Sequence, residues 1–381
     1  MFKRLININP DSKHSAFILG PRGTGKTYWL RENFSHAMYF DLLDHEVYTE
    51  FLASPARLSD FIPSNYTSWI IIDEIQKVPS LLNEVHRLIE HRGLRFILTG
   101  SSARNLRRKG VNLLAGRALT YHMYPLTTVE LGNRFNLSFS LKYGNLPSVY
   151  DHEDPKRYLS TYISTYLKEE VQQESLTRNL ALFARFLETA AFSQGEVLNY
   201  TEIAREVGSN RHTIINFFSI LEDLLIAYRL PVFSKRAKRD VISHPKFYYF
   251  DVGVYRAIRP TGPLDINAEI DGPALETLFL QEAIAINDYF SLDYKIYYWR
   301  TRSKLEIDFI LYGEKGLYVF EIKRKKKIAP SDLQAIKTFL LDYPMAKCFL
   351  LYGGNKTYTD QDIKIMPYEL ALTELRDILS Q

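Results

Sequence analysis

A glycine-rich segment between an apolar run and a helical pattern constrains the fold of this chain most strongly. It matches the pattern GxxxxGK[ST] of a phosphate-binding loop, and its residues are Gly20, Pro21, Arg22, Gly23, Thr24, Gly25, Lys26 and Thr27. Glycines let consecutive backbone N–H groups approach phosphate oxygens, and the following helix adds its positive N-terminal end. We expect Lys26 to reach the β- and γ-phosphates of ATP and Thr27 to bind Mg²⁺. The segment therefore predicts a nucleotide site at the end of a buried strand.

The residues around this loop indicate an α/β unit. Short apolar runs alternate with helical patterns, and the runs are Ala16–Leu19, Ala37–Asp41, Trp69–Ile72, Arg95–Leu98 and Ala118–Tyr124. Continuous apolar runs are typical of parallel strands that are buried on both faces, with crossover helices between them. We therefore predict a doubly covered parallel sheet that carries the phosphate-binding loop.

Acidic and hydroxyl residues follow two of these runs. Asp73 and Glu74 come after the third run, where Asp73 would hold Mg²⁺ through water and Glu74 would act as general base toward the attacking water. The fourth run ends near Thr99 and Ser101, either of which could sense the γ-phosphate. These positions favour ATP hydrolysis over phosphoryl transfer to a small acceptor.

The motifs together resemble those of an AAA+ ATPase. The similar segments are Gly20–Thr27, Ile70–Gln76, Ile97–Ser102 and Leu114–Arg117. In this resemblance Arg117 corresponds to the arginine finger that one subunit inserts into its neighbour's site, which implies a homo-oligomer, with a hexamer favoured. A guanidinium suits that role because its donor fork meets phosphate oxygens bidentately. Arg104 is the alternative, and a surface salt bridge is the simpler interpretation of either residue.

Beyond residue 132 the pattern changes to long amphipathic stretches at Pro155–Val171 and Asn179–Phe192. We predict an ATPase core over 1–132, a helical connector over 133–194, a winged helix-turn-helix over 195–260 and a nuclease-like domain over 261–381. Thr201 is the expected N-cap of the first winged-helix helix, and Pro260–Pro273 the expected linker. A basic stretch after the second helix could contact DNA phosphates or simply be solvated, and its cations are Lys235, Arg236, Lys238 and Arg239.

The last hundred residues contain a second set of candidate site residues. Glu276 lies on a predicted helix, Asp308 on one strand, and Glu321 and Lys323 at the end of the next. Alternation puts Glu321 and Lys323 on one face of their strand. The set resembles a PD-(D/E)xK nuclease site, in which Asp308 and Glu321 would hold Mg²⁺ or Mn²⁺; surface salt bridges are the alternative. The whole chain thereby resembles predicted prokaryotic ATPases that join an AAA+ module to a winged helix and a restriction-endonuclease-like domain.

Composition excludes several other classes of protein. The 381 residues are 46% hydrophobic and 24% charged, unlike a disordered tail or a small disulfide scaffold, and the single cysteine, Cys348, cannot pair within the chain. The sequence contains no signal-peptide pattern and no apolar window of membrane-spanning length, so we expect a cytoplasmic protein without a membrane partner. A net charge of +4 is too small to identify a polyanionic partner by itself.

Local charge favours a nucleic-acid partner instead. Cations interleaved with aromatic residues surround the nuclease-like set, and they include Arg300, Arg302 and Lys325. The first hypothesis is an oligomeric ATPase that couples hydrolysis to binding, translocation or remodelling of DNA, including branched DNA. The second is an ATP-regulated, metal-dependent DNA endonuclease. The third is a nucleotide-switched regulatory scaffold with very slow turnover.

Overall fold

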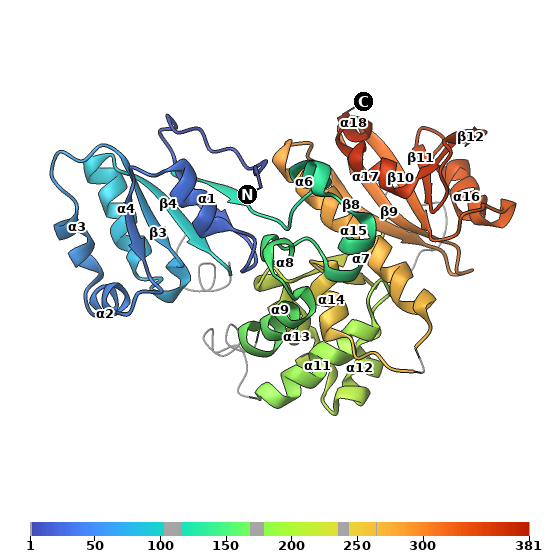
Figure 1. Ribbon diagram of the computed structural model, residues 1–381, viewed down its shortest axis with the longest axis horizontal. Helices are drawn as coiled ribbons and strands as arrows, with labels where there is room; N and C mark the ends of the chain where they lie inside the picture. Colours follow the sequence, from blue (N-terminus) through green and yellow to red (C-terminus); the bar gives the residue numbers. More distant parts are fainter. Residues whose placement is uncertain are drawn as a thin grey trace. The chain divides into compact units, whose positions relative to one another are not determined.

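The computed structural model describes residues 2–102, 114, 116–167, 179–234, 244–263 and 265–380. Two compact units are present, an N-terminal unit of residues up to 124 with 223–225 and a C-terminal unit of 125–222 with 226–381. Both are drawn in Figure 1. Arg104 and the basic stretch Lys235, Arg236, Lys238 and Arg239 lie outside the described residues. Among the described helices, none is long and apolar enough to cross a membrane.

The N-terminal unit is built on a parallel sheet, as the continuous apolar runs predict. In the described residues its strand order is β2-β3-β4-β1-β5, and each neighbouring pair is parallel. The strands are β1 Ser15–Leu19, β2 Met38–Asp41, β3 Trp69–Asp73, β4 Arg95–Gly100 and β5 Ala118–His122. Every residue of β1 and β3 is buried, which explains why their apolar residues are consecutive rather than at alternate positions, with Ser15 and Asp73 at the strand ends.

Helices connect these strands (Figure 1). They are α1 Lys26–Asn33, α2 His45–Ala53, α3 Leu58–Phe61 and α4 Leu81–Arg92, with 3₁₀ turns at Pro55–Arg57 and Ile75–Lys77. The side chain of Asp44 caps α2 by accepting from the backbone N–H groups of Glu46 and Val47. Gly93 ends α4 in the left-handed conformation that glycine adopts without strain. Because the five strands are parallel, the loops that follow them lie at one edge of the sheet.

The first half of the C-terminal unit is mainly helical. Its helices are α6 Thr128–Leu131, α7 Leu137–Tyr143, α8 Pro147–Asp151, α9 Pro155–Thr161, α11 Leu180–Phe192, α12 Tyr200–Val207, α13 Arg211–Asp223 and α14 Val252–Ile258. A 3₁₀ turn spans Gly132–Arg134, a π-helix spans Tyr162–Leu167, and β6 Ala227–Leu230 pairs antiparallel with β7 Lys246–Tyr249. Of the amphipathic stretch Pro155–Val171, the described part is α-helical to Thr161 and π-helical over Tyr162–Leu167, and residues 168–171 lie outside the described residues.

Two expectations about helix starts in this unit are wrong. Helix α12 is capped by Asn199 rather than Thr201, because the Asn199 side chain accepts from the backbone N–H of Glu202. The segment Pro260–Pro273 is not a linker along its whole length, since α15 Asn267–Tyr289 begins inside it and contains Pro273. A proline within a helix costs about 3 kcal/mol, and buried α15 residues such as Ala274 and Leu278 supply the packing that offsets this cost.

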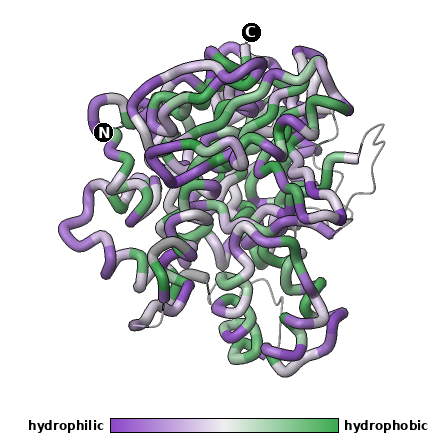
Figure 2. Tube along the Cα trace, turned by 90° about the vertical axis from the view of Figure 1, so that its right-hand side faces the viewer, coloured by the Kyte–Doolittle hydropathy of each residue, from purple (hydrophilic) through white to green (hydrophobic). Residues whose placement is uncertain are grey.

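The C-terminal unit ends in a mixed sheet with the order β12-β13-β11-β10-β9-β8. Its strands are β8 Lys295–Arg300, β9 Glu306–Gly313, β10 Gly316–Lys323, β11 Lys347–Tyr352, β12 Tyr358–Asp360 and β13 Ile363–Pro367. The remaining helices are α16 Gln334–Asp342, α17 Tyr368–Thr373 and α18 Leu375–Ser380, with a 3₁₀ turn at Pro330–Leu333. In Figure 2 hydrophobic residues follow the inner strands of this sheet, which are buried, and hydrophilic residues collect in loops.

Candidate functional site

The phosphate-binding loop joins β1 to α1, as its sequence pattern predicts. Gly23 and Gly25 have φ values of 81° and 92°, in the left-handed region that favours glycine. Lys26 is only 5% exposed, and its ammonium donates to the carbonyl oxygens of Gly20 at 2.7 Å and Pro21 at 3.1 Å. The loop thus holds its own lysine in place with carbonyl groups that phosphate oxygens can replace.

Gly20, the first glycine of the motif, also has a packing role. A Cβ atom at this position would lie 2.3 Å from the carbonyl oxygen of Met123, which follows β5. The backbone N–H of Met123 in turn donates to the carbonyl of Leu19 at 2.8 Å. The first glycine of the motif is therefore required where β1 and the end of β5 approach each other.

Asp73 lies at the end of β3 and is surrounded by hydroxyl donors. Thr27 Oγ1 donates to Asp73 Oδ2 at 2.7 Å, and Tyr39 Oη donates to the same oxygen. Thr99 Oγ1 donates to Asp73 Oδ1. Burial raises the pKa of Tyr39 well above its ordinary value, and the neighbouring Asp73 raises it further, so this phenol remains a donor. Thr27 and Asp73 are the hydroxyl and carboxylate that fit a Mg²⁺ site beside the loop.

Glu74 occupies a strained turn directly after β3. Its φ of 60° and ψ of 45° lie in the left-handed region, which costs a residue with a Cβ about 1 kcal/mol. Its backbone N–H donates to Thr99 Oγ1 at 3.0 Å, and its carboxylate accepts from the Gln76 side chain. Gln76 also donates to Ser101 Oγ at 2.9 Å, and Ser101 lies 3.4 Å from Glu74 Oε2. The turn directs the Glu74 carboxylate to the end of β4, where both sensor candidates lie.

Three residues of this region were not expected from the sequence. Arg4 donates to the carbonyls of Thr24 in the loop and Tyr124 after β5, each at 2.6 Å. Tyr39 contacts Asp73 because β2 is the neighbour of β3 in the sheet, and Gln76 contacts Glu74 across a 3₁₀ turn. An arginine near the start and a tyrosine within an apolar run carry no distinctive pattern, so no motif could have identified Arg4 or Tyr39.

Arg117 lies immediately before β5, as expected. Its side chain is 39% exposed and forms an ion pair with Glu90 on α4, and it lowers the pKa of Glu90. Its backbone carbonyl accepts from Ser15 N at 3.0 Å at the start of β1. Arg22 is exposed on the phosphate-binding loop itself. A partly exposed guanidinium that pairs with an exposed carboxylate can exchange that partner for another anion.

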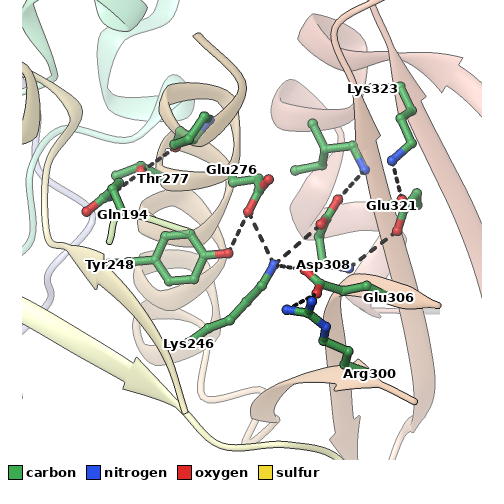
Figure 3. A network of polar contacts seen from close by, with 12 residues as sticks. Gln194, Lys246, Tyr248, Glu276, Thr277, Arg300, Glu306, Asp308, Glu321 and Lys323 are labelled. Atoms are coloured by element: carbon green, nitrogen blue, oxygen red, sulfur yellow. Dashed lines mark hydrogen bonds and ion pairs between the residues drawn. The ribbon is translucent and has the colours of Figure 1, made fainter. Parts of the chain in front are cut away.

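The second set of site residues also converges, in the C-terminal unit (Figure 3). Four carboxylates form what we term the carboxylate centre, and they are Glu276 on α15, Glu306 and Asp308 on β9, and Glu321 on β10. Asp308 Oδ2 accepts from Ile322 N at 2.8 Å, and Asp308 N lies 3.4 Å from Glu321 Oε2. Lys323 pairs with Glu321, and Arg300 pairs with Glu306 at 3.2 Å. The fold thus brings together the predicted set Glu276, Asp308, Glu321 and Lys323, and Glu306 lies beside it.

Lys246 reaches this centre from β7. Its Nζ lies 3.6 Å from Glu276 Oε2 and 3.7 Å from Asp308 Oδ1, and it forms a closer pair with Glu306. Tyr248, two residues on, donates to Glu276 Oε2 at 2.6 Å. Burial raises the pKa of Glu276 to about 7, with Asp308 adding to the shift and Lys246 opposing it. Burial alone would lower the pKa of Lys246, but the surrounding groups raise it well above its ordinary value, so Lys246 is charged.

The remaining basic residues near this centre lie at the surface. Arg302 is exposed in the turn between β8 and β9. The Lys325 side chain is 48% exposed and pairs with Asp332 at 2.6 Å. Arg300 is partly buried by its pair with Glu306. Of these three cations, Arg302 and Lys325 are the ones that a nucleic-acid backbone could approach from solvent.

Family models match three consecutive parts of the chain. Residues 12–132 match an AAA domain, residues 134–266 a domain of unknown function (DUF8612), and residues 271–371 another domain of unknown function (DUF4143). The first match agrees with the parallel sheet and with the phosphate-binding loop. The N-terminal unit is accordingly a nucleotide-binding domain of the AAA, ATPase-like class.

Related chains occur in bacteria and archaea. An uncharacterized protein of Mycobacterium tuberculosis is 27% identical over 369 residues, which cover 94% of this chain and 81% of that protein. An uncharacterized protein of Methanocaldococcus jannaschii is 23% identical over 379 residues, covering 90% of this chain and 83% of that protein. Among solved structures, the Aeropyrum pernix ORC1 protein in complex with DNA is similar with a TM-score of 0.26 and 15% identity, covering 64% of this chain and 86% of that chain. This structural similarity is too low to indicate a shared fold.

Proposed function

We propose that the N-terminal unit binds ATP with Mg²⁺ and hydrolyses it. The observation that carries this proposal is the meeting of Thr27, Asp73 and Glu74 at the carboxyl edge of the parallel sheet, beside Lys26. Lys26 and the loop backbone would hold the phosphates, and Thr27 and Asp73 would hold Mg²⁺. The bound Mg²⁺ supplies positive charge against the phosphate oxygens.

Glu74 is the proposed general base toward the attacking water. Its carboxylate is nearly buried and is oriented by Gln76, so little reorganisation is needed before it accepts a proton. Thr99 already uses its hydroxyl to join Asp73 to the backbone of Glu74, which makes it a positioning residue. Ser101, which contacts Gln76 and Glu74, is therefore the better candidate for the γ-phosphate sensor.

Arg117 is the proposed arginine finger in a homo-oligomer, with a hexamer favoured by resemblance to AAA+ proteins. The support is its position just before β5, its partial exposure and its ion pair with the exposed Glu90. A neighbouring subunit's γ-phosphate would offer a stronger partner for the guanidinium than an exposed glutamate does. Hydrolysis would then depend on assembly.

We further propose that the C-terminal unit contacts DNA and that ATP hydrolysis drives translocation along DNA or remodelling of DNA. The exposed cations Arg302 and Lys325 support this proposal, and the residues 235–239 would add phosphate contacts of the kind made by a winged helix. Phosphate contacts of this kind carry no sequence information, so binding is expected to weaken with salt and to depend little on sequence.

Two variants test the ATPase site. Lys26→Ala should abolish binding of a fluorescent ATP analogue, whereas Glu74→Gln should keep binding and lose about 10²-fold or more in turnover. Glu32→Gln changes an exposed glutamate on α1 and is the matched control, which should retain both properties. Wild-type turnover in Glu74→Gln would show that Glu74 is not the base.

The DNA proposal is tested by measuring ATP hydrolysis by size-fractionated protein with single-stranded, duplex and branched DNA. Stimulation in an oligomeric fraction, with strands intact on a denaturing gel, is the expected result. Hydrolysis that no DNA stimulates, together with absent salt-dependent DNA binding, would instead favour a nucleotide-switched scaffold. Metal-dependent strand cleavage would favour the endonuclease hypothesis.

A further inference from the structure

The carboxylate centre of the C-terminal unit already contains a cation from the chain itself. We propose that the Lys246 ammonium occupies the place of a divalent metal in this centre. The nuclease-like set would then be a closed ion network that fastens β7 to the C-terminal sheet, and not a metal-dependent cutting site. This proposal is independent of the ATP site.

The position of the lysine is the first observation. Lys246 is only 1% exposed, and Figure 3 shows its side chain extending from β7 into the space between Glu276, Glu306 and Asp308. Two of these carboxylates come from different elements, since Glu276 is on α15 and Asp308 is on β9. In the nuclease-like arrangement Asp308 and Glu321 are the expected metal ligands, and the ammonium lies between one of them, Asp308, and the helix carboxylate Glu276.

The second observation is that the oxygens required for a metal are already in use. Asp308 Oδ1 faces Lys246 at 3.7 Å, and Asp308 Oδ2 accepts from Ile322 N at 2.8 Å. Glu321 Oε1 pairs with Lys323, and Glu321 Oε2 lies 3.4 Å from the backbone N–H of Asp308. In the described part of the chain, no group of three or more histidine, cysteine, aspartate or glutamate side chains is placed to hold a metal. Mg²⁺ or Mn²⁺ at Asp308 and Glu321 would therefore have to displace the cations Lys246 and Lys323, whereas Asp73 in the nucleotide site accepts from neutral hydroxyl groups.

The third observation is the charge balance of the carboxylate centre. The four carboxylates of the centre face three cations, which are Lys246, Lys323 and Arg300. A divalent ion would add two positive charges beside a buried ammonium, and Coulomb repulsion is strong where water is excluded. Lys246 cannot move to solvent without β7, whose four residues are all buried. The network is thus largely neutralised from within.

The network also joins two differently matched parts of the chain. Lys246 and Tyr248 lie within residues 134–266, whereas Glu276, Asp308 and Glu321 lie within residues 271–371. The junction continues in the backbone, because Phe233 N donates to the carbonyl of Tyr298 on β8 at 2.7 Å. Residues 271–371 contain the whole nuclease-like set, whereas Lys246, which lies among its carboxylates, comes from residues 134–266.

The test measures Mn²⁺ binding to the full chain, without nucleotide, by electron paramagnetic resonance. Wild type and Asp308→Asn should bind the same number of Mn²⁺ ions, because the centre holds none. Lys246→Met removes the ammonium that faces Glu276 and Asp308, so this variant should gain one Mn²⁺ per chain. The double variant Lys246→Met/Asp308→Asn should lose it again. Lys347→Met, which changes an exposed lysine on β11, is the matched control and should gain no site.

Two results would overturn the proposal. One is wild type that binds one Mn²⁺ more than Asp308→Asn, which would show that the carboxylates take a metal despite the lysine. The other is a folded Lys246→Met that gains no Mn²⁺, with folding checked by circular dichroism. If Lys246→Met does not fold, the comparison of wild type with Asp308→Asn still decides, since the amide introduced by Asp308→Asn keeps a carbonyl acceptor for Ile322 N.

Discussion

Glu282 should make the stability of the C-terminal unit depend on pH. Its side chain on α15 is fully buried, and its carboxylate oxygens accept from the backbone N–H of Thr128 at 3.1 and 3.0 Å. The Thr128 hydroxyl donates to the same carboxyl at 2.8 Å, which holds the start of α6. Burial raises the pKa of Glu282 to about 8, although the hydrogen bonds from Thr128 oppose the shift. The folded protein therefore favours the protonated carboxyl.

The size of the change in the free energy of unfolding with pH follows from proton linkage. A carboxyl whose pKa is higher in the folded protein stabilises it fully below the unfolded pKa, and this contribution is lost as pH rises through the folded value. The unfolded pKa is about 4.3 and each unit of difference corresponds to about 1.4 kcal/mol. With a folded pKa of about 8, Glu282 should lower the free energy of unfolding by roughly 3–4 kcal/mol between about pH 5 and about pH 8.

The assay is urea unfolding of wild type and Glu282→Gln at both pH values. Glutamine keeps an acceptor for Thr128 and does not titrate in this range. The free energy of unfolding of Glu282→Gln should therefore fall less than that of wild type as pH rises. Other titrating groups contribute to both proteins and cancel in the difference. Glu369→Gln, at an exposed position on α17, is the control and should follow wild type. Parallel profiles for wild type and Glu282→Gln would show that Glu282 does not contribute to the pH dependence of stability.

Two further predictions concern assembly and packing. Arg117→Ala should reduce ATP turnover by about 10³-fold. Mixing Arg117→Ala with Glu74→Gln subunits should restore activity at interfaces where an intact Arg117 meets an intact Glu74. If oligomers that exchange subunits do not recover activity, Arg117 does not act between subunits. Gly253→Ala should destabilise the C-terminal unit by about 1–3 kcal/mol, because its Cβ would lie 2.0 Å from the Tyr143 carbonyl oxygen. Gly262→Ala, where no atom lies within 4 Å of a built Cβ, should change the free energy of unfolding by less than about 0.5 kcal/mol in the same urea assay.

Much of the N-terminal unit could be predicted because its signals are local. The apolar runs mark the parallel strands to within two residues at each end, and the loop Gly20–Thr27 follows the first strand. Parallel strands place their carboxyl ends on one edge of the sheet, so Asp73 and Thr99 had to lie near the loop. The strained backbone of Glu74 and its contact with Gln76 could not be foreseen, since they depend on how the turn after β3 packs.

The helix starts show where local signals compete. Asn199 and Thr201 are both good capping residues two positions apart, and only the packed helix decides that Asn199 is the cap. Prolines predict a linker over Pro260–Pro273, but α15 begins at Asn267 because burial of its apolar residues outweighs the cost of Pro273.

The order of amino acids in the chain specifies which residues are available for chemistry. It contains the loop that ends in Lys26 and Thr27, the acids Asp73 and Glu74, and the set Glu276, Asp308, Glu321 and Lys323. Strand alternation and motif spacing act over a few residues, so they were enough to group these side chains.

The residues that accompany these side chains come from distant parts of the chain and depend on how the segments pack. Tyr39 reaches Asp73 only because β2 lies beside β3, and Lys246 reaches Glu276 and Asp308 only because β7 packs against α15 and β9. Lys246 is 30 and 62 positions from these partners in the chain, and no periodicity links residues so far apart. Whether Glu276, Glu306 and Asp308 face a metal or an ammonium depends on packing between segments, because charge balance is a property of the folded site.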